Sequence, residues 1–228
     1  MEKWIGNLLV DASPPEKPKF KAPLILIHGT WTNSGCWQPW STHFANLGWE
    51  CWAINFRGRF GREAFQELKR LTFDDCLEDL KRVIRASPFP PVLLAHSLGA
   101  LVAAKAAERE PLSALVLLSA LPPREIRTAL PRPLRLLRLK YAPLLWLRRP
   151  FRIDDGDFRA TWLHSMDESR RREILETLVP ESGRLAKDFF DRRIGISGDS
   201  VRCPVLVVSG RDDRVAPVES QREMAERL

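Results

Sequence analysis

The chain has 228 residues, enough for one domain with a large hydrophobic core. Hydrophobic residues make up 44% of it and charged residues 29%, the balance of a soluble globular protein. No apolar run reaches the ~20 residues of a membrane span, and Met1–Phe20 has no signal-peptide pattern. The four cysteines are scattered without a C-x-x-C pair. We therefore expect neither a disulfide framework nor a metal site, and a reducing cytoplasm as the location.

The net charge of +7 is concentrated in one segment of the chain. Between Arg124 and Arg152 there are nine basic residues and one acidic residue, Glu125. The basicity therefore belongs to this segment and not to the fold as a whole. No zinc-finger, helix-turn-helix or RNA-recognition pattern surrounds it, so we predict no nucleic-acid partner.

Short apolar runs predict five buried strands. The first two are Pro23–Gly29 and Glu50–Gly58. Three more follow at Pro91–Ser97, Ser113–Ala120 and Cys203–Gly210. Runs that are apolar throughout are typical of parallel strands buried on both faces of a sheet.

Helical patterns alternate with these strands. The clearest is Leu71–Ala86, whose apolar residues form one stripe and whose Thr72 and Asp75 have the spacing of a capping box. Another helical pattern follows Ser97, and Val218–Leu228 follows the last strand. The alternation predicts an α/β fold with a mostly parallel sheet and helices on both faces.

The alternation stops after Leu121 and resumes only with the last predicted strand. The intervening stretch is helical in pattern, interrupted by prolines and rich in arginine. We interpret residues 122–200 as a helical cap inserted after the strand Ser113–Ala120, over the sheet edge where open α/β sheets bind ligands. Residues 1–121 and 201–228 then form the core domain.

The basic part of this cap has three interpretations. Leu134 and Leu137 are three residues apart, which places them on one face of a short helix. Arg135 and Arg138 have the same spacing and lie on another face. In the first, the leucines face the cleft and the arginines face water. In the second, the segment Arg124–Arg152 binds the surface of an anionic membrane. In the third, the arginines bind an anionic substrate such as a phospholipid or acyl-CoA.

Ser97 lies between a predicted strand and a predicted helix, so it occupies a tight turn. Small residues two before and two after it, Ala95 and Gly99, relieve the crowding of such a turn. The pattern A-x-S-x-G departs mildly from G-x-S-x-G, because alanine has almost no side chain. His96 stands beside the serine, but adjacent residues at a sharp turn project apart, and we expect His96 to pack beside the sheet.

Backbone N–H groups near Ser97 could stabilise an oxyanion. The N–H of Leu98 belongs to the first residue of the predicted helix and can donate to a developing negative charge. A second donor should come from the loop after Pro23–Gly29. Thr30 is the first candidate and Trp31 the second.

Three segments together resemble a known superfamily. "LILIHGTW", "LLAHSLGA" and "VLVVSGRDDRVAP" are similar to the oxyanion loop, nucleophile elbow and acid loop of α/β-hydrolases, in that superfamily's order and over nearly the whole chain. The resemblance implies the α/β-hydrolase fold and a serine nucleophile, Ser97, as in esterases, lipases and thioesterases, with no cofactor. The family's G-x-x-D spacing after the last strand points to Asp213 as the acid, with Asp212 as its neighbour.

The resemblance also implies a histidine after Asp213, because hydrolases of this fold order their triad Ser…Asp/Glu…His. None of the four histidines, His28, His43, His96 and His164, follows Asp213. The family position of His28 is structural, and His164 falls in the cap. We interpret the sequence as a C-terminally shortened hydrolase whose 228-residue chain is a poor catalyst. The loss of a strand would also expose Cys203–Gly210 as a sheet edge and favour self-association.

The leading hypothesis is a serine hydrolase, esterase-, lipase- or lysophospholipase-like, that cleaves a carboxylic ester or thioester of a small-molecule acyl substrate through an acyl-enzyme on Ser97. The alternative is a non-catalytic protein of the same fold that binds a small apolar ligand. Lyase or transferase chemistry with the same triad also stays open, because one fold hosts many reactions.

Overall fold

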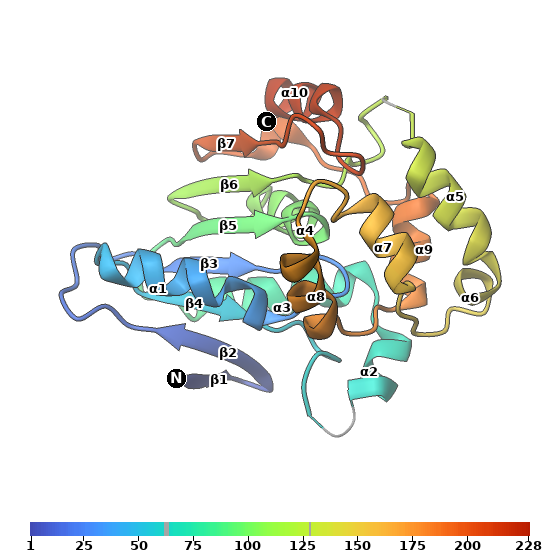
Figure 1. The fold of residues 1–228 in the computed structure, drawn as a ribbon. Coiled ribbons are helices and arrows are strands. Elements are labelled where there is room, and N and C mark those ends of the chain that lie inside the picture. Colours follow the sequence, from blue (N-terminus) through green and yellow to red (C-terminus); the bar gives the residue numbers. More distant parts are fainter. Residues whose placement is uncertain (62–63, 128) are drawn as a thin grey trace.

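The computed structural model describes residues 1–61, 64–127 and 129–228. A central β-sheet carries helices on both faces, and further helices lie beyond one end of its strands (Figure 1). The strands are β1 (Glu2–Ile5), β2 (Leu8–Ser13), β3 (Leu24–Ile27), β4 (Cys51–Ile54), β5 (Val92–His96), β6 (Ala114–Leu118) and β7 (Val205–Val208). The α-helices are α1 (Gln38–Asn46), α2 (Ala64–Arg70), α3 (Phe73–Arg85), α4 (Leu98–Ala107), α5 (Arg132–Lys140), α6 (Ala142–Trp146), α7 (Asp155–Thr161), α8 (Glu168–Thr177), α9 (Gly183–Phe190) and α10 (Val218–Arg227). Two 3₁₀ turns are η1 (Ser34–Trp37) and η2 (Gly198–Ser200).

Within the described residues the strand order is β1-β2-β4-β3-β5-β6-β7. The strands from β4 to β7 pair in parallel, whereas β1 and β2 pair antiparallel with each other and β2 pairs antiparallel with β4. The five parallel strands are the five that the apolar runs predict, and the mostly parallel α/β sheet is confirmed. The hairpin of β1 and β2 has no counterpart among those predictions, because in β2 buried residues alternate with half-buried ones and no continuous apolar run forms.

The helices that flank the sheet begin and pack as their sequences indicate. The capping box of α3 is confirmed: Thr72 Oγ1 accepts the N–H of Asp75 at 3.2 Å, and the Asp75 carboxylate accepts the N–H of Thr72 at 2.9 Å. The apolar stripe of α3 is buried beside α4, which is buried along almost its whole length. In Figure 1, α1 lies on one face of the sheet, and α3 and α4 lie on the other.

The chain between β6 and β7 is helical, as its pattern predicts. Helices α5 to α9 of this helical segment (Arg132–Phe190) lie beyond the carboxyl ends of the parallel strands (Figure 1). In α5, Leu134 and Leu137 are buried while Arg135 and Arg138 are exposed, so the two faces that the spacing predicts are present.

Three further properties concern the described part of the chain as a whole. None of its helices is long and apolar enough to cross a bilayer. No group of three or more His, Cys, Asp or Glu side chains within it is arranged to hold a metal ion. The four cysteines, Cys36, Cys51, Cys76 and Cys203, are free thiols.

Candidate active site

Ser97 has a backbone conformation that residues other than glycine rarely adopt. It lies between β5 and α4 with φ +54° and ψ −118°. Its N–H donates to the carbonyl of Leu118 at 3.0 Å, and its own carbonyl accepts the N–H of Leu121 at 3.1 Å. Strained residues of this kind concentrate at functional sites, because surrounding structure must hold them in place.

Small residues let three segments meet at Ser97. A Cβ atom on Gly99 would lie 2.3 Å from the carbonyl oxygen of His28 and 2.9 Å from the side chain of Ile27, so only glycine fits there. A Cβ atom on Gly29 would lie 3.0 Å from Cβ of Ser97. Ala95, one of the small residues expected around the serine, is fully buried. The end of β3 and the start of α4 therefore approach each other at the serine.

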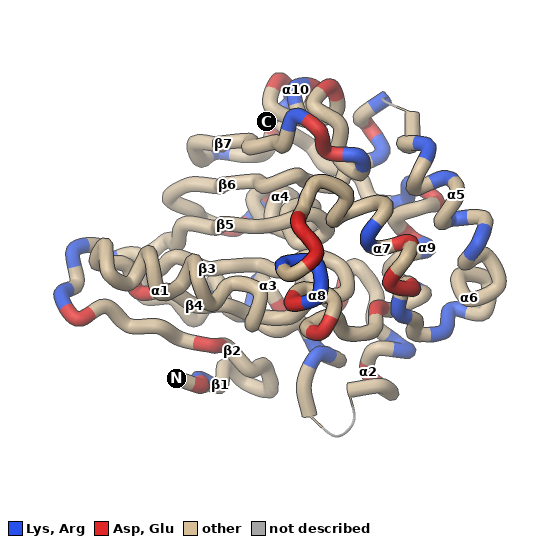
Figure 2. Tube along the Cα trace, in the orientation of Figure 1, with Lys and Arg blue, Asp and Glu red and all other residues tan. Residues whose placement is uncertain are grey.

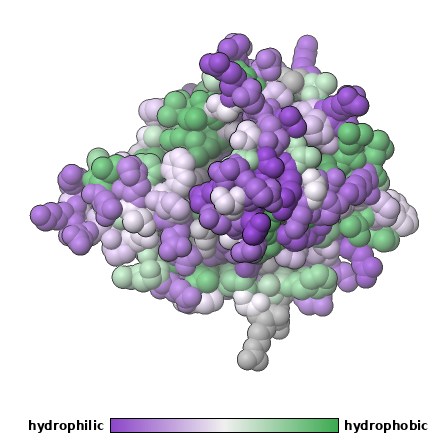
Figure 3. All heavy atoms as spheres, viewed as in Figure 1, coloured by the Kyte–Doolittle hydropathy of each residue, from purple (hydrophilic) through white to green (hydrophobic). Residues whose placement is uncertain are grey.

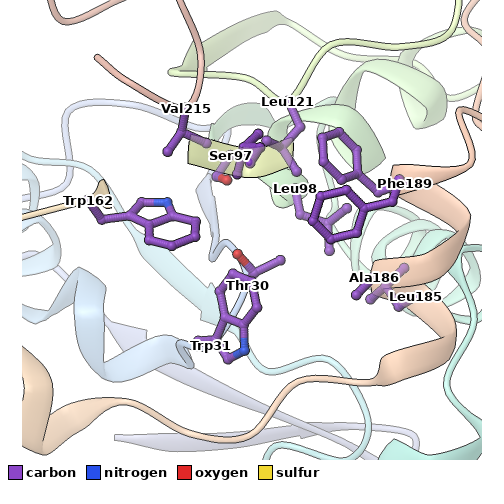
Figure 4. Close-up of a pocket in the computed structure, with 12 residues that line it drawn as sticks. Thr30, Trp31, Ser97, Leu98, Leu121, Trp162, Leu185, Ala186, Phe189 and Val215 are labelled. Atoms are coloured by element: carbon purple, nitrogen blue, oxygen red, sulfur yellow. The ribbon is translucent and has the colours of Figure 1, made fainter. Parts of the chain in front are cut away.

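Two backbone donors are available beside the serine. Among the described residues, neither the N–H of Leu98 nor that of Thr30 donates to a protein acceptor. Both residues line the same cavity as Ser97. Figure 4 shows the hydroxyl groups of Ser97 and Thr30 facing each other at one end of this cavity. The Leu98 N–H also belongs to the first turn of α4, where the helix dipole favours negative charge.

Trp31 ties the same loop to the helical segment instead of offering a donor. Its N–H donates to Oε2 of Glu181 at 3.4 Å, and its carbonyl accepts the N–H of Val179 at 2.9 Å. Its buried indole packs edge-on against the rings of Phe151 and Trp162, with centroids 5.9 and 5.3 Å away. Of the two candidates for the second oxyanion donor, Thr30 is therefore the one whose N–H is unused.

The cavity beside Ser97 is apolar and holds about 380 Å³ of empty space. Its walls come from the start of α4, from the loop after β3 and from the helical segment (Figure 4). Phe189 and Phe190 of α9 both line it. The other lining residues are Thr30, Trp31, Leu98, Leu121, Leu134, Trp162, Leu185, Ala186 and Val215. Ser97 itself is 6% exposed, so its hydroxyl faces this cavity and is shielded from bulk solvent.

Asp213 lies after β7, and its carboxylate is held by the backbone. Its Oδ1 accepts the N–H groups of Val215 and Ala216 at 2.8 and 2.9 Å. Among the described residues, Oδ2 has no hydrogen-bond partner. Asp213 lines a second, more polar cavity of about 740 Å³ of empty space, and Trp162 lines both this cavity and the one beside Ser97. Asp212 lines the second cavity too but is exposed to solvent.

His28 has both ring nitrogens engaged. Nδ1 lies 2.8 Å from the carbonyl oxygen of Gly29, and Nε2 accepts the N–H of Phe56 at 3.4 Å, so the proton is on Nδ1. Burial, assisted by the charge of Arg59, lowers the pKa of His28 to about 3. A neutral imidazole with both nitrogens occupied orders the loop and cannot serve as a general base.

The remaining histidines do not complete a triad in the structure. His43 is exposed on α1. His96 lies against Gly29, and burial lowers its pKa despite the nearby charge of Asp213. Nδ1 of His164 lies 3.4 Å from the carbonyl oxygen of Thr161. His96 and His164 line the cavity of Asp213, yet no imidazole of the described chain forms a hydrogen bond with Ser97 or Asp213.

A buried ion pair beneath the loop of Trp31 has no local sequence signal. The guanidinium of Arg59, which follows β4, binds the carboxylate of Glu181, which precedes α9. Glu181 also accepts the N–H of Ser182 at 2.7 Å. The two charged residues are far apart in the chain, and neither lies in a recognisable sequence motif. Only the folded structure therefore reveals the pair.

Several solved structures share this fold. A monoacylglycerol lipase from Paleococcus ferrophilus is 18% identical, with a TM-score of 0.72 over 97% of this chain and 84% of that one. The esterase RhEst1 from Rhodococcus sp. ECU1013 is 18% identical, with a TM-score of 0.71 over 97% and 82%. An esterase from Exiguobacterium antarcticum is 16% identical, with a TM-score of 0.70 over 97% and 83%. A comparison with curated protein sequences finds no match.

The strand order and these structures confirm the α/β-hydrolase fold. This is the fold implied by the segments "LILIHGTW", "LLAHSLGA" and "VLVVSGRDDRVAP". The family described as "Alpha/beta hydrolase family" matches residues 24–228, which include all three segments. The chain belongs to the α/β-hydrolase family.

Proposed function

We propose that this protein is a serine hydrolase that cleaves a carboxylic ester or thioester through an acyl-enzyme on Ser97. One observation carries the proposal: a serine with φ +54° at the start of a helix, facing an apolar cavity. A protein that only needed to pack α4 against β5 would gain nothing from this strain. Esterases and a lipase among the structures of the same fold support ester chemistry.

The proposed reaction has two halves. Oγ of Ser97 bonds to the substrate carbonyl carbon, and the carbonyl electron pair moves onto oxygen, where the N–H groups of Leu98 and Thr30 stabilise the negative charge. Collapse of this intermediate expels the alcohol or thiol, which receives the serine proton through a general base. Water then attacks the acyl-serine in the same way, which releases the acid and restores Ser97. No cofactor takes part.

Asp213 is proposed as the acid that orients the base. Oδ1 is held by two backbone N–H groups, which leaves Oδ2 for an imidazole placed in the adjoining cavity. Because no described histidine is bonded to Asp213 or Ser97, we expect the polypeptide of residues 1–228 to turn over slowly. Hydrolases that lack a triad member retain only about 10³- to 10⁴-fold catalysis over water.

The cavity favours small, apolar acyl groups. Its lining is almost wholly apolar, and the rings of Trp31, Trp162 and Phe189 crowd it, which suits a short apolar acyl chain. Residues 122–200 act in this proposal as the cap that selects the acyl group, because Leu134, Trp162 and Phe189 from this segment form part of the wall.

A non-catalytic protein that binds a small apolar ligand is the second candidate. The absence of a hydrogen bond from any described imidazole to Ser97 or Asp213 favours it. A fluorophosphonate probe distinguishes the two, because a serine that faces oxyanion donors reacts with it, even slowly, whereas an ordinary buried hydroxyl does not.

We expect the probe to label the polypeptide of residues 1–228 slowly, because the oxyanion donors act without a bonded imidazole, and to leave Ser97→Ala unlabelled. With p-nitrophenyl butyrate we expect slow turnover, because both half-reactions need the base, with a rate unchanged by His164→Ala and higher than with p-nitrophenyl palmitate. Absence of labelling in a folded protein that still binds an apolar dye would favour the binding protein. Robust turnover that His164→Ala abolishes would contradict the slow-turnover expectation and identify His164 as the base.

A further inference from the structure

A surface on α5 and α6 combines exposed apolar side chains with unpaired arginines. On α5, Arg132, Arg135, Leu136 and Leu139 follow one another at i, i+3, i+4 and i+7, so they share the face opposite the buried leucines of that helix. Leu139 is 73% exposed. We call these four residues, together with Trp146, Leu147, Arg148 and Arg149, the α5–α6 surface.

The second half of this surface continues the pattern. Trp146 ends α6 and is 77% exposed, and the three residues after it are exposed as well. Helices α5 and α6 follow each other directly in the chain and pack together. Figure 3 shows apolar side chains beside hydrophilic ones at this end of the molecule.

Most arginines of the surface have no acidic neighbour among the described residues, and Arg148 alone lies near a carboxylate, that of Asp188. On the flank of α5, Arg138 pairs with Asp191, which follows α9, and Lys140 pairs with two acidic residues at the start of α7. In contrast, none of the arginines of the α5–α6 surface forms an ion pair with a described residue, and residues 130–150 contain no acid. Figure 2 shows basic residues along α5 and near α6 at this edge of the molecule.

We propose that the α5–α6 surface binds the headgroup region of an anionic lipid bilayer. Interfacial helices place leucine and tryptophan side chains among the lipid headgroups and acyl chains while arginines contact the anionic groups. Tryptophan favours this depth of the membrane, because its ring is apolar and its N–H is polar. The proposal concerns binding alone and does not depend on the hydrolysis proposed for Ser97.

Other occupants fit the surface less well. A second copy of the chain would bring two clusters of unpaired arginines face to face, which repel each other. A nucleic acid would satisfy the arginines but leave Leu136, Leu139 and Trp146 in water. The alternation of apolar and basic side chains matches a layer that offers both negative charge and hydrocarbon.

The test is flotation of the purified polypeptide with vesicles of phosphatidylcholine, with or without phosphatidylserine. We expect binding to the anionic vesicles that weakens as salt increases. Arg135→Gln/Arg149→Gln should reduce binding to them on the order of 25-fold, because each charge near an anionic surface contributes about fivefold. Leu139→Ser/Trp146→Ser should reduce binding to the same vesicles by about tenfold or more, because two apolar side chains no longer enter the bilayer.

Matched controls come from the opposite end of the sheet. Lys17→Gln/Lys21→Gln removes two exposed charges from the loop before β3, and Phe89→Ser removes an exposed ring before β5. We expect both controls to bind as the unmodified protein does, and all variants to melt at the same temperature. Equal binding to neutral vesicles, or equal losses in the lysine control, would overturn the proposal. So would full binding by Leu139→Ser/Trp146→Ser, because the surface would then be a general polyanion site.

Discussion

Arg59 and Glu181 form an ion pair whose side chains are 1% and 0% exposed, although 122 residues separate them in the chain. The pair joins the loop after β4 to the segment before α9. Because Glu181 also accepts the N–H of Trp31, one carboxylate connects the sheet, the proposed oxyanion loop and the helical segment.

Breaking this pair should destabilise the protein strongly. Glu181→Leu would leave the Arg59 guanidinium buried without a counter-charge, and such a loss lowers the free energy of unfolding by about 3–5 kcal/mol. The double variant Arg59→Met/Glu181→Leu should lose less than Glu181→Leu alone, because both charges are then absent. Urea unfolding measures each value.

Glu173→Leu, in the exposed pair of Arg170 and Glu173, serves as the control and should change stability by less than about 1 kcal/mol. A Glu181→Leu variant as stable as the wild type would show that the pair contributes no net stability.

The conformation of Ser97 should appear in the stability of its variants. At φ +54° glycine avoids a strain that alanine retains, so Ser97→Gly should be more stable than Ser97→Ala by about 1 kcal/mol. The same two substitutions at Ser41, inside α1, should have the reverse order by about 0.5–1 kcal/mol, because glycine weakens a helix interior. Thermal or urea unfolding of the four variants decides the matter, and the same order at both positions would argue against backbone strain at Ser97.

His28 should make the protein sensitive to acid. Burial lowers its pKa to about 3 in the folded state, whereas an unfolded imidazole titrates near 6.5. Between these values the unfolded state binds a proton that the folded state does not, so stability is present above about pH 6.5 and is lost as the pH falls toward 3, by up to about 1.4 kcal/mol per pH unit.

A comparison with His28→Asn isolates this contribution from that of other groups. We expect the wild type to lose stability relative to the variant as the pH falls from about 7 to about 4, when urea midpoints are measured at each pH. Parallel pH profiles for the two proteins would contradict the assignment of the acid sensitivity to His28.

The outer edge of β7 should promote self-association, because it offers unpaired backbone groups to another chain. Among the described residues β7 pairs on one side only, with β6, and its Leu206 and Val208 are exposed. The polypeptide of residues 1–228 should therefore form dimers or larger species in sedimentation experiments. Leu206→Lys/Val208→Lys should shift it toward monomer, whereas Phe89→Lys, far from this edge, should not. A monodisperse monomer at high protein concentration would refute this expectation.

Local patterns were sufficient for much of the fold. The parallel strands are continuous apolar runs, and the turn at Ser97 requires the small residues that the sequence shows. The hairpin of β1 and β2 escaped prediction because its alternating burial depends on a partner, β4, that lies about 40 residues away in sequence. A pattern of local runs cannot supply that partner.

The candidate site also contains residues that the sequence predicts and residues that only the folded structure reveals. Ser97, Leu98 and Gly99 are predicted from one turn, and Thr30 and Asp213 are predicted from the loops after the strands β3 and β7. The walls of the cavity are not, because Leu134 and Trp162 reach it only through the packing of the helical segment onto the sheet. Nor does the sequence reveal that His28 uses both ring nitrogens on the backbone.

The contacts of Trp31 have a consequence for how a substrate reaches Ser97. The loop that carries Thr30 is joined to the helical segment by a backbone hydrogen bond to Val179 and by the rings that pack edge-on against the Trp31 indole. A hinged opening of that segment would break these contacts together with the buried ion pair. We therefore expect entry through side-chain rotations of residues such as Trp162, on nanosecond to microsecond timescales, and no millisecond opening of a lid in relaxation-dispersion measurements. The acyl group would then reach Ser97 through rotations of single side chains, while the backbone around the cavity keeps its position.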